Sequence, residues 1–374
     1  MSTYLDCNAT TPVDPDVAEI MWRFLVENFG NPGSRTHELG NTAKIAVEHA
    51  REQVASVVRT DKSDVTFTSG ATEANNLALV GLKGYLLESK KTVITSQIEH
   101  MAVLEPLAHL EAAGVKVMYL APNKDGIIEP SDLEGLLSDD VGLVSLMHIN
   151  NETGAIQPIE KYADILARTN TYFHVDAAQG FGKDIEQLQH DRIDMISCSG
   201  HKIHGPKGIG ALITKRRRYK RPPITPLLLG GGQERNLRAG TLPTHQIAGF
   251  GLAAELALSN AGKRHLCCLK IKEDAIAAFD RLTPVYNGLK YSASHTLNLS
   301  VRGVNSEAAI VALKGVAALS NGSACTSSSY THSHVLKAMK VDDDVLEGAL
   351  RFSWSHMTSK VDWELIVKKL SELT

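Results

Sequence analysis

The chain has 374 residues, of which 43% are hydrophobic and 22% charged, and its formal net charge at pH 7 is -3. Such a composition is typical of a globular protein with a large core, and the weak negative charge argues against nucleic acid as the main ligand. No stretch comes near the roughly 18 apolar residues of a membrane span, and the first residues lack the basic and apolar regions of a signal peptide, so we expect a cytoplasmic protein without membrane contact.

Two helices are predicted near the N-terminus. Asp14-Pro15 is a favourable helix start, because aspartate caps free amides and proline suits the first turn. Apolar residues then recur at helical spacing from Val17 to Leu25. The loop Gly30-Asn31-Pro32-Gly33 ends this helix, and a second amphipathic helix is expected from His37 to Val58.

Strand-like and helical patterns alternate from residue 65 onwards. Several of the strand-like runs are apolar throughout, which is typical of parallel strands covered on both faces. We therefore predict an α/β fold with a mostly parallel seven-stranded sheet in a large domain, residues 14–256. The expected strands are Val65–Thr68, Thr92–Thr95, Val115–Leu120, Val141–Ile149, Tyr172–Val175, Met195–Cys198 and Gly208–Thr214.

The pattern changes after residue 256, where a smaller α+β domain is predicted from residues 1–13 and 257–374. A long helix, Lys263 to Leu282, starts this part, and the N-terminal strand Tyr4–Leu5 is expected to join it. The other expected elements are strands at Val285–Asn287, Thr296–Val301, Ala317–Leu319 and Leu350–Ser353 and a helix at Ser306–Lys314.

One basic run, Lys215 to Arg221, follows the last strand of the large domain. A solvated loop is the favoured interpretation. The alternative is a docking patch for an acidic partner or for nucleic acid.

A possible phosphate site follows the first predicted strand. Gly70 permits a sharp turn after Ser69, and a helix begins near Thr72, so free amides and a hydroxyl meet at a helix N-terminus. An ordinary strand–turn–helix junction explains the same pattern. Neither GxGxxG nor a Walker loop is present, which disfavours a dinucleotide or a nucleoside triphosphate.

Polar side chains also follow other strands: His100, Asn151, Asp176 with Gln179, and Ser199-Gly200-His201-Lys202. Ligands of open α/β sheets bind beyond the carboxyl ends of the strands. A reactive lysine needs a shielded pocket, and a buried aspartate needs a cationic partner. Pyridoxal 5'-phosphate (PLP) satisfies both needs, since it bonds to a lysine and carries a pyridinium nitrogen. Taken singly, these residues also have structural explanations: Lys202 could be a surface lysine, and His100 could be a core histidine.

Cys325 lies in a run of small polar residues, Ser320 to Ser329. A thiol on such a segment is presented to water, as a nucleophile must be, whereas a structural cysteine is usually buried among apolar side chains. The five cysteines are an odd number without a CxxC pair, so neither a disulfide framework nor a metal site is expected.

Together these motifs resemble the NifS/IscS-type (group I) cysteine desulfurases of the PLP-dependent class V aminotransferase family. The resemblance extends over nearly the whole chain, with two departures, at Cys7-Asn8 and at Trp354-Ser355. The motifs that carry it are Gly30–Ser34, Ser69–Glu73, Glu99-His100, Asn150–Glu152, His174–Gln179, Ser199–Lys202, Gly230–Arg235, Arg238–Pro243, Gly322–Cys325 and Arg351–Ser353.

The resemblance implies the PLP-dependent transferase fold (fold type I) and a cysteine desulfurase that converts L-cysteine to L-alanine. PLP would bind covalently to Lys202, which then acts as the base, and the sulfur would pass to Cys325 as a persulfide and on to an acceptor protein. The resemblance also implies that Asp176 pairs with the pyridinium nitrogen, that His100 stacks on the ring, and that Asn151 and Gln179 contact the ring oxygen. The phosphate contacts would be Ala71, Thr72, Ser199 and His201, and the substrate carboxylate would be bound by Arg351 and Asn31. Thr241 would reach the phosphate of the other subunit of a homodimer.

Two questions stay open at this point. A PLP-dependent aminotransferase or lyase of the same fold that does not use Cys325 is the alternative function. The run Gly33–His37 and the end of the chain at Thr374 resemble desulfurases that serve DNA phosphorothioation, while iron–sulfur cluster assembly and tRNA thiolation are the other expected pathways.

Overall fold

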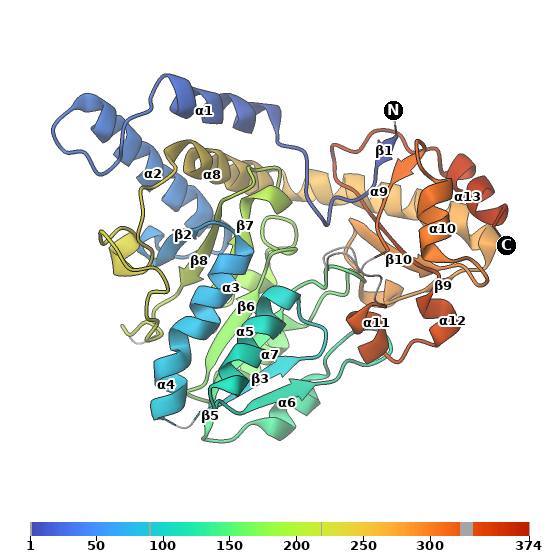
Figure 1. The fold of residues 1–374 in the computed structure, drawn as a ribbon, viewed down its shortest axis with the longest axis horizontal. Helices are drawn as coiled ribbons and strands as arrows, with labels where there is room; N and C mark the ends of the chain where they lie inside the picture. Colours follow the sequence, from blue (N-terminus) through green and yellow to red (C-terminus); the bar gives the residue numbers. More distant parts are fainter. Residues whose placement is uncertain (1, 90, 218, 322–331, 374) are drawn as a thin grey trace.

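The computed structural model describes residues 2–89, 91–217, 219–321 and 332–373. Its centre is a seven-stranded sheet, here called the large sheet, with the order β2-β8-β7-β6-β5-β3-β4 (Figure 1). Strand β8 is antiparallel to both neighbours and the other pairs are parallel. The predicted fold class is therefore confirmed. The strands are β2 (Val65–Thr68), β3 (Thr92–Ser96), β4 (Val117–Leu120), β5 (Val141–Met147), β6 (Tyr172–Asp176), β7 (Met195–Ser199) and β8 (Gly210–Thr214).

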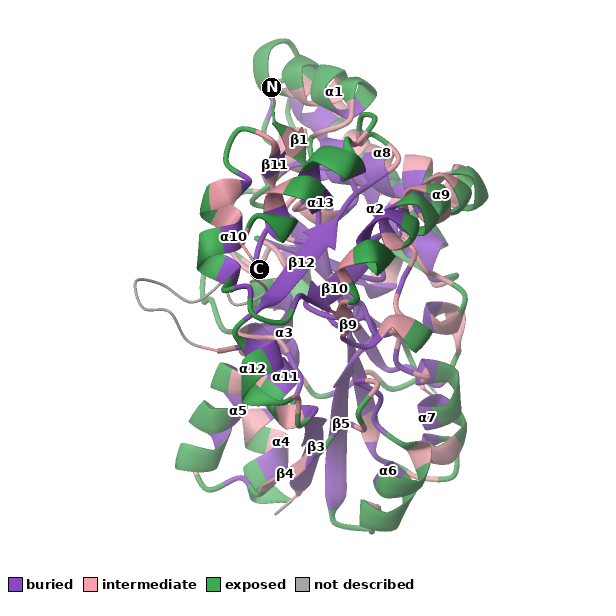
Figure 2. Cartoon of the chain, turned by 90° about the vertical axis from the view of Figure 1, so that its right-hand side faces the viewer, coloured by how far each residue is buried: buried purple, intermediate pink, exposed green. Residues whose placement is uncertain are grey.

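Helices cover both faces of the large sheet. Neighbouring strand residues point to opposite faces, so Val93 packs with one helical layer and Ile94 with the other. This explains why most of these strands are buried along their whole length (Figure 2). One layer contains α3 (Ala71–Leu79), α4 (Lys83–Glu88) and α5 (Met101–Ala112); the other contains α2 (Glu38–Val57), α6 (Pro130–Leu136), α7 (Ile159–Leu166) and α8 (Thr244–Ser259).

Helix α1 (Pro15–Val26) begins as predicted, with the Asp14 side chain accepting a hydrogen bond from the Asp16 amide. It packs against α8 at the edge of the molecule (Figure 1). Only Val17 of this helix is buried, whereas Trp22 and Leu25 remain more than half exposed. The apolar face of α1 is thus largely uncovered within one chain.

The C-terminal elements form a second core around a three-stranded antiparallel sheet, the small sheet, with the order β12-β10-β9. Phe279, Phe352, Trp354 and Trp363 stack edge to face in this core. The elements are α9 (Ala261–Phe279), β9 (Val285–Tyr286), β10 (Thr296–Ser300), α10 (Ser306–Ala312), β11 (Ala317–Ala318), α11 (His334–Ala338), α12 (Asp343–Leu346), β12 (Ala349–Ser353) and α13 (Trp363–Ser371).

The N-terminal strand β1 (Thr3–Tyr4) pairs in parallel with β11, so its predicted association with the C-terminal elements is confirmed. Residues Leu336 and Met339 of the α11 segment, by contrast, pack into the core of the large sheet. The division into two domains at residue 256 stays a prediction. Across the described residues, no helix has both the length and the apolar character needed to cross a membrane.

The basic run folds back onto acidic groups of the large sheet. Arg216 and Arg221 pair with Asp64, and Arg217 lies 3.6 Å from a carboxylate oxygen of Asp194. The ammonium group of Lys215 donates to two backbone carbonyls. These contacts support a structural role for the described part of the run, which leaves out residue 218.

Candidate active site

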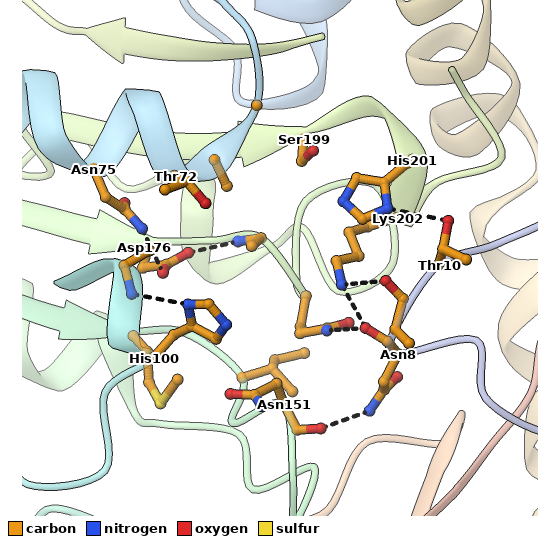
Figure 3. Close-up of a pocket in the computed structure, with 18 of the residues that line it drawn as sticks. Asn8, Thr10, Thr72, Asn75, His100, Asn151, Asp176, Ser199, His201 and Lys202 are labelled. Atoms are coloured by element: carbon orange, nitrogen blue, oxygen red, sulfur yellow. Dashed lines mark hydrogen bonds between the residues drawn. The ribbon is translucent and has the colours of Figure 1, made fainter. Parts of the chain in front are cut away.

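A cavity of about 480 Å³ lies at the carboxyl ends of the parallel strands, where Figure 3 shows the side chains converging. The turns that follow β2, β3, β5, β6 and β7 each contribute to its lining. The structure therefore brings together residues as far apart in the chain as Asn8 and Arg351. The predicted residues in the lining are Ala71, Thr72, His100, Asn151, Asp176, Gln179, Ser199, His201, Lys202 and Arg351.

Lys202 ends a short 3-10 turn that follows β7. Its ammonium nitrogen donates to the backbone carbonyls of Asn8 at 2.5 Å and Ala9 at 2.9 Å. These two carbonyls belong to the N-terminal segment and lie on the wall of the cavity. The amine is thus presented to the cavity by contacts with main-chain oxygens.

Asp176 ends β6 and is only 5% exposed. One carboxylate oxygen accepts from the Asn75 side-chain amide at 2.8 Å, and the other accepts from the Ala178 backbone amide at 2.9 Å. No described lysine or arginine lies within salt-bridge distance of it. A buried carboxylate held only by neutral donors is a suitable partner for a cationic group of a ligand.

His100 caps the N-terminus of α5 through its ring. The Nδ1 atom accepts from the Ala102 backbone amide at 3.0 Å, so the neutral ring carries its proton on Nε2. Burial lowers the pKa of His100, although the nearby Asp176 opposes this effect. The residue is therefore a neutral imidazole that can lie against an aromatic ligand and donate a proton from Nε2.

Helix α3 begins at the same cavity without a side-chain cap, because its N-cap residue is Gly70. The one acidic residue of the first turn, Glu73, is neutralised by Arg238 and by the Ser69 amide. Free amides and an unopposed helix dipole therefore face the cavity beside Ser199. This combination favours the binding of a phosphate group.

His201 lies near the same end of the cavity, with Nδ1 3.2 Å from the Thr10 hydroxyl. Burial, together with the charges of the neighbouring Lys202 and Lys207, lowers the pKa of His201 to about 4. The ring is therefore neutral at pH 7 and can donate one hydrogen bond to an anion.

Arg351, on β12, is almost fully buried. Its guanidinium donates to the Asp6 carboxylate at 2.7 Å and to the Asn151 carbonyl at 3.0 Å, while Nε has no partner among the described residues. These bonds use two of the five N–H donors of the guanidinium, so donors remain for a ligand carboxylate at this side of the cavity.

Two predicted residues lie elsewhere. Asn31 and Thr241 line a different cavity, of about 270 Å³, together with Arg51 and Glu234. Within one chain, the structure does not bring Asn31 beside Arg351, because the two residues line different cavities. Cys325 falls within residues 322–331, which lie outside the described part of the chain.

The sequence did not reveal the roles of Asn75 and Asn8. Asn75 follows Thr72 by three residues on α3, a helical spacing that could have placed it on the same side of the helix. The Asn8 carbonyl accepts from both Lys202 and Gln179. No local pattern predicts that contact, because it joins residues 194 positions apart.

The residues of this cavity fit PLP. Lys202 can bond its aldehyde, Asp176 can hold the pyridinium nitrogen, and the uncapped start of α3 can hold its phosphate.

Comparisons with known proteins agree with this arrangement. The Aminotransferase class-V family model matches residues 3–365. Cysteine desulfurase IscS of Pseudomonas aeruginosa is 43% identical over 373 residues, which are 99% of this chain and 92% of that protein. The crystal structure of DndA from Streptomyces lividans is 45% identical, with a TM-score of 0.83, and covers 94% of this chain and 99% of that one. The structure of SspA in complex with cysteine is 34% identical, with a TM-score of 0.83, and the match covers 96% of this chain and 100% of that one. The chain therefore belongs to the class-V aminotransferase family.

Proposed function

We propose that the protein is a PLP-dependent cysteine desulfurase, which converts L-cysteine to L-alanine and transfers the sulfur to Cys325. One observation carries this proposal: the Lys202 amine, the Asp176 carboxylate and the uncapped start of α3 face one cavity. The relatives named cysteine desulfurase and the SspA structure with cysteine support the choice of reaction and substrate.

PLP, when bound, supplies an electron sink for bond breaking at the substrate α-carbon. Asp176 would keep the ring nitrogen protonated, and His100 would lie against the ring. Asn151 and Gln179 would contact the ring oxygen, and Ala71, Thr72, Ser199 and His201 would hold the phosphate. Arg351 would bind the substrate carboxylate through its open donor.

Two groups of the chain would carry out the proton and sulfur transfers. Nζ of Lys202 would take the proton from the substrate α-carbon. The Cys325 thiolate would attack the substrate sulfur, so that an S–S bond forms while the C–S bond breaks. The substrate β-carbon then takes a proton, which the protonated Lys202 amine can supply, and becomes the methyl group of alanine, while His100 is placed to donate a hydrogen bond from Nε2.

Two substitutions test this function. Lys202→Ala should abolish both the yellow colour of the bound cofactor and the release of alanine from L-cysteine. Cys325→Ser should keep the colour but form no persulfide, as measured by thiol labelling and mass spectrometry. A Cys325→Ser protein that still releases alanine and sulfide at the wild-type rate would favour the aminotransferase or lyase alternative.

We also propose a homodimer in which Thr241 reaches the active site of the other subunit. The apolar residues left exposed on α1 and α2 support this proposal, because surfaces of this kind mark protein interfaces. Asn31 lies beside Thr241 in the same cavity, so it would act on the partner's substrate in the same way. The acceptor of the Cys325 sulfur would be a protein of DNA phosphorothioation, iron–sulfur assembly or tRNA thiolation. Purification of the persulfide-loaded protein together with its bound acceptor tests this last proposal.

A further inference from the structure

A second, smaller cavity of about 50 Å³ adjoins the other side of Lys202. Among the described residues that line it are two lysines, an arginine and four histidines, but no aspartate or glutamate. Its volume exceeds the roughly 10–15 Å³ that one water requires, so a small ion fits. Acidic groups outside the lining include Asp14, whose carboxylate lies 3.9 Å from Arg264, and Asp184, which interacts electrostatically with His265.

Lys183 is the central cation of this cavity. Its ammonium group donates to the Gln179 side-chain carbonyl at 3.2 Å and has no carboxylate within salt-bridge distance among the described residues. Burial lowers the pKa of Lys183 to about 8, and only the thiols of Cys7 and Cys268 oppose this effect. An ammonium group inside a protein normally has an anionic partner.

His295 provides an independent indication of a ligand. Its side chain is only 6% exposed and lines the same cavity, yet Nε2 has no hydrogen-bond partner among the described residues. A buried imidazole nitrogen without a partner costs free energy unless a ligand or an ordered water satisfies it. The open nitrogen and the unpaired ammonium group thus line one small space.

We propose that this cavity binds a small monovalent anion of the size and charge of chloride. The ammonium group of Lys183 and a ring N–H of His295 would contact the ion, and Arg264 would add long-range attraction.

The site is connected to the active-site cavity through Gln179 as well as through Lys202, which lines both cavities. Gln179 accepts from Lys183 through its side-chain oxygen, so its amide nitrogen is directed to the Asn8 carbonyl at 2.8 Å. An anion that keeps Lys183 charged would also keep Gln179 in this orientation. Lys183 is thus a positioning residue in this proposal.

Bromide, an anomalous scatterer with the charge of chloride, is the probe. Crystals of the wild-type holoenzyme grown in sodium bromide should show an anomalous peak between Nζ of Lys183 and Nε2 of His295. Ordered water alone at that position would overturn the proposal.

Thermal unfolding in increasing bromide gives a second test with a matched control. Lys215 is also inside the protein, and burial lowers its pKa, but its ammonium group is satisfied by the backbone carbonyls of Leu188 and His190. Wild type and Lys215→Met should show the same saturable rise in Tm. In Lys183→Met, the bromide concentration that gives half of the rise in Tm should be at least tenfold higher. If Lys183→Met does not fold, His295→Phe takes its place in this test. An equal response of all variants would overturn the anion site.

Discussion

Glu99, next to the catalytic candidate His100, is completely buried. One of its carboxyl oxygens accepts from the Ser96 hydroxyl and from the Met147 amide, while the other has no partner among the described residues. Burial, together with the negative charge of Asp176, raises the pKa of Glu99 to about 8. The residue is therefore a neutral acid at pH 7, and its proton is part of the folded structure.

This assignment predicts how stability depends on pH. Between pH 4.5 and about pH 8, the folded protein keeps a proton that the unfolded chain releases, so the free energy of unfolding decreases as the pH rises. Glu99→Gln has no such proton. Relative to wild type, the variant should gain about 3 kcal/mol between the two ends of this range. Urea unfolding at both pH values measures the difference. Glu364→Gln, at an exposed ion pair, is the control and should leave the pH dependence unchanged.

Single residues of the site differ in how far the sequence could reveal them. Lys202, Asp176 and Ala71 follow strands that could be recognised by their apolar runs, and the carboxyl ends of parallel strands meet at one edge of a sheet. Asn8 could not be found in this way, because it enters the cavity from a segment paired with the C-terminal elements. Asn31 was grouped with Arg351 by resemblance, and a single chain keeps the two apart.

At the scale of elements, the start of α3 depends on the backbone of Gly70. This residue has a φ of 154° and a ψ of -178°, a conformation that essentially only glycine adopts. Gly210 on β8 packs directly against it, and a side chain on Gly210 would come within 2.7 Å of the Gly70 backbone. The close fit of β8 to this turn holds the first amides of α3 toward the cavity.

Gly70→Ala should therefore reduce both stability and cofactor binding. We expect a loss of about 1–3 kcal/mol in the free energy of unfolding from backbone strain, together with weaker PLP affinity in an absorbance titration. Gly84→Ala is the matched control, because Gly84 lies exposed on α4 with no atom within 4 Å of an added side chain. That change should stabilise the protein by about 0.4–1 kcal/mol. Unaltered PLP affinity in Gly70→Ala would contradict the phosphate role of this turn.

The elements themselves were largely predictable, since strands β2, β3 and β5 to β8 begin and end within two residues of the expected limits. Long apolar runs leave little freedom in the assignment of strands covered on both faces. The helix that starts the C-terminal part was harder to delimit: α9 ends at Phe279, and the next residues form a 3-10 turn. Periodicity identified an apolar face on α1 but could not show that this chain leaves it open.

At the scale of the whole molecule, the exposed apolar face of α1 is a part of the surface that one chain leaves without a packing partner. Leu25, Phe29 and Ile45 are each more than half exposed, and they belong to the α1–α2 end of the molecule (Figure 1). Leu229, in the loop that precedes Thr241, is 88% exposed. A contiguous apolar area of this kind favours contact with a second copy of the chain.

Phe29→Asp and Ile45→Asp, made together, should convert the proposed dimer to monomer. Burying two carboxylates in an apolar interface costs far more than the 1.4 kcal/mol that corresponds to a tenfold change in affinity. Sedimentation velocity measures the change, and Val311→Asp, at a 71% exposed site on α10, is the control. A wild-type protein that sediments as a monomer at micromolar concentration would refute the dimer.

Asn8 connects the two sheets at the reactive amine. Its carbonyl accepts from Lys202, its side chain donates to Thr296 on the small sheet, and its amide donates to Ser353 on β12. A hinge motion of one sheet relative to the other must therefore move the same peptide group that accepts from Lys202. Opening and closing of the enzyme would therefore shift the carbonyl that holds the Lys202 amine, with no separate element needed to transmit the motion.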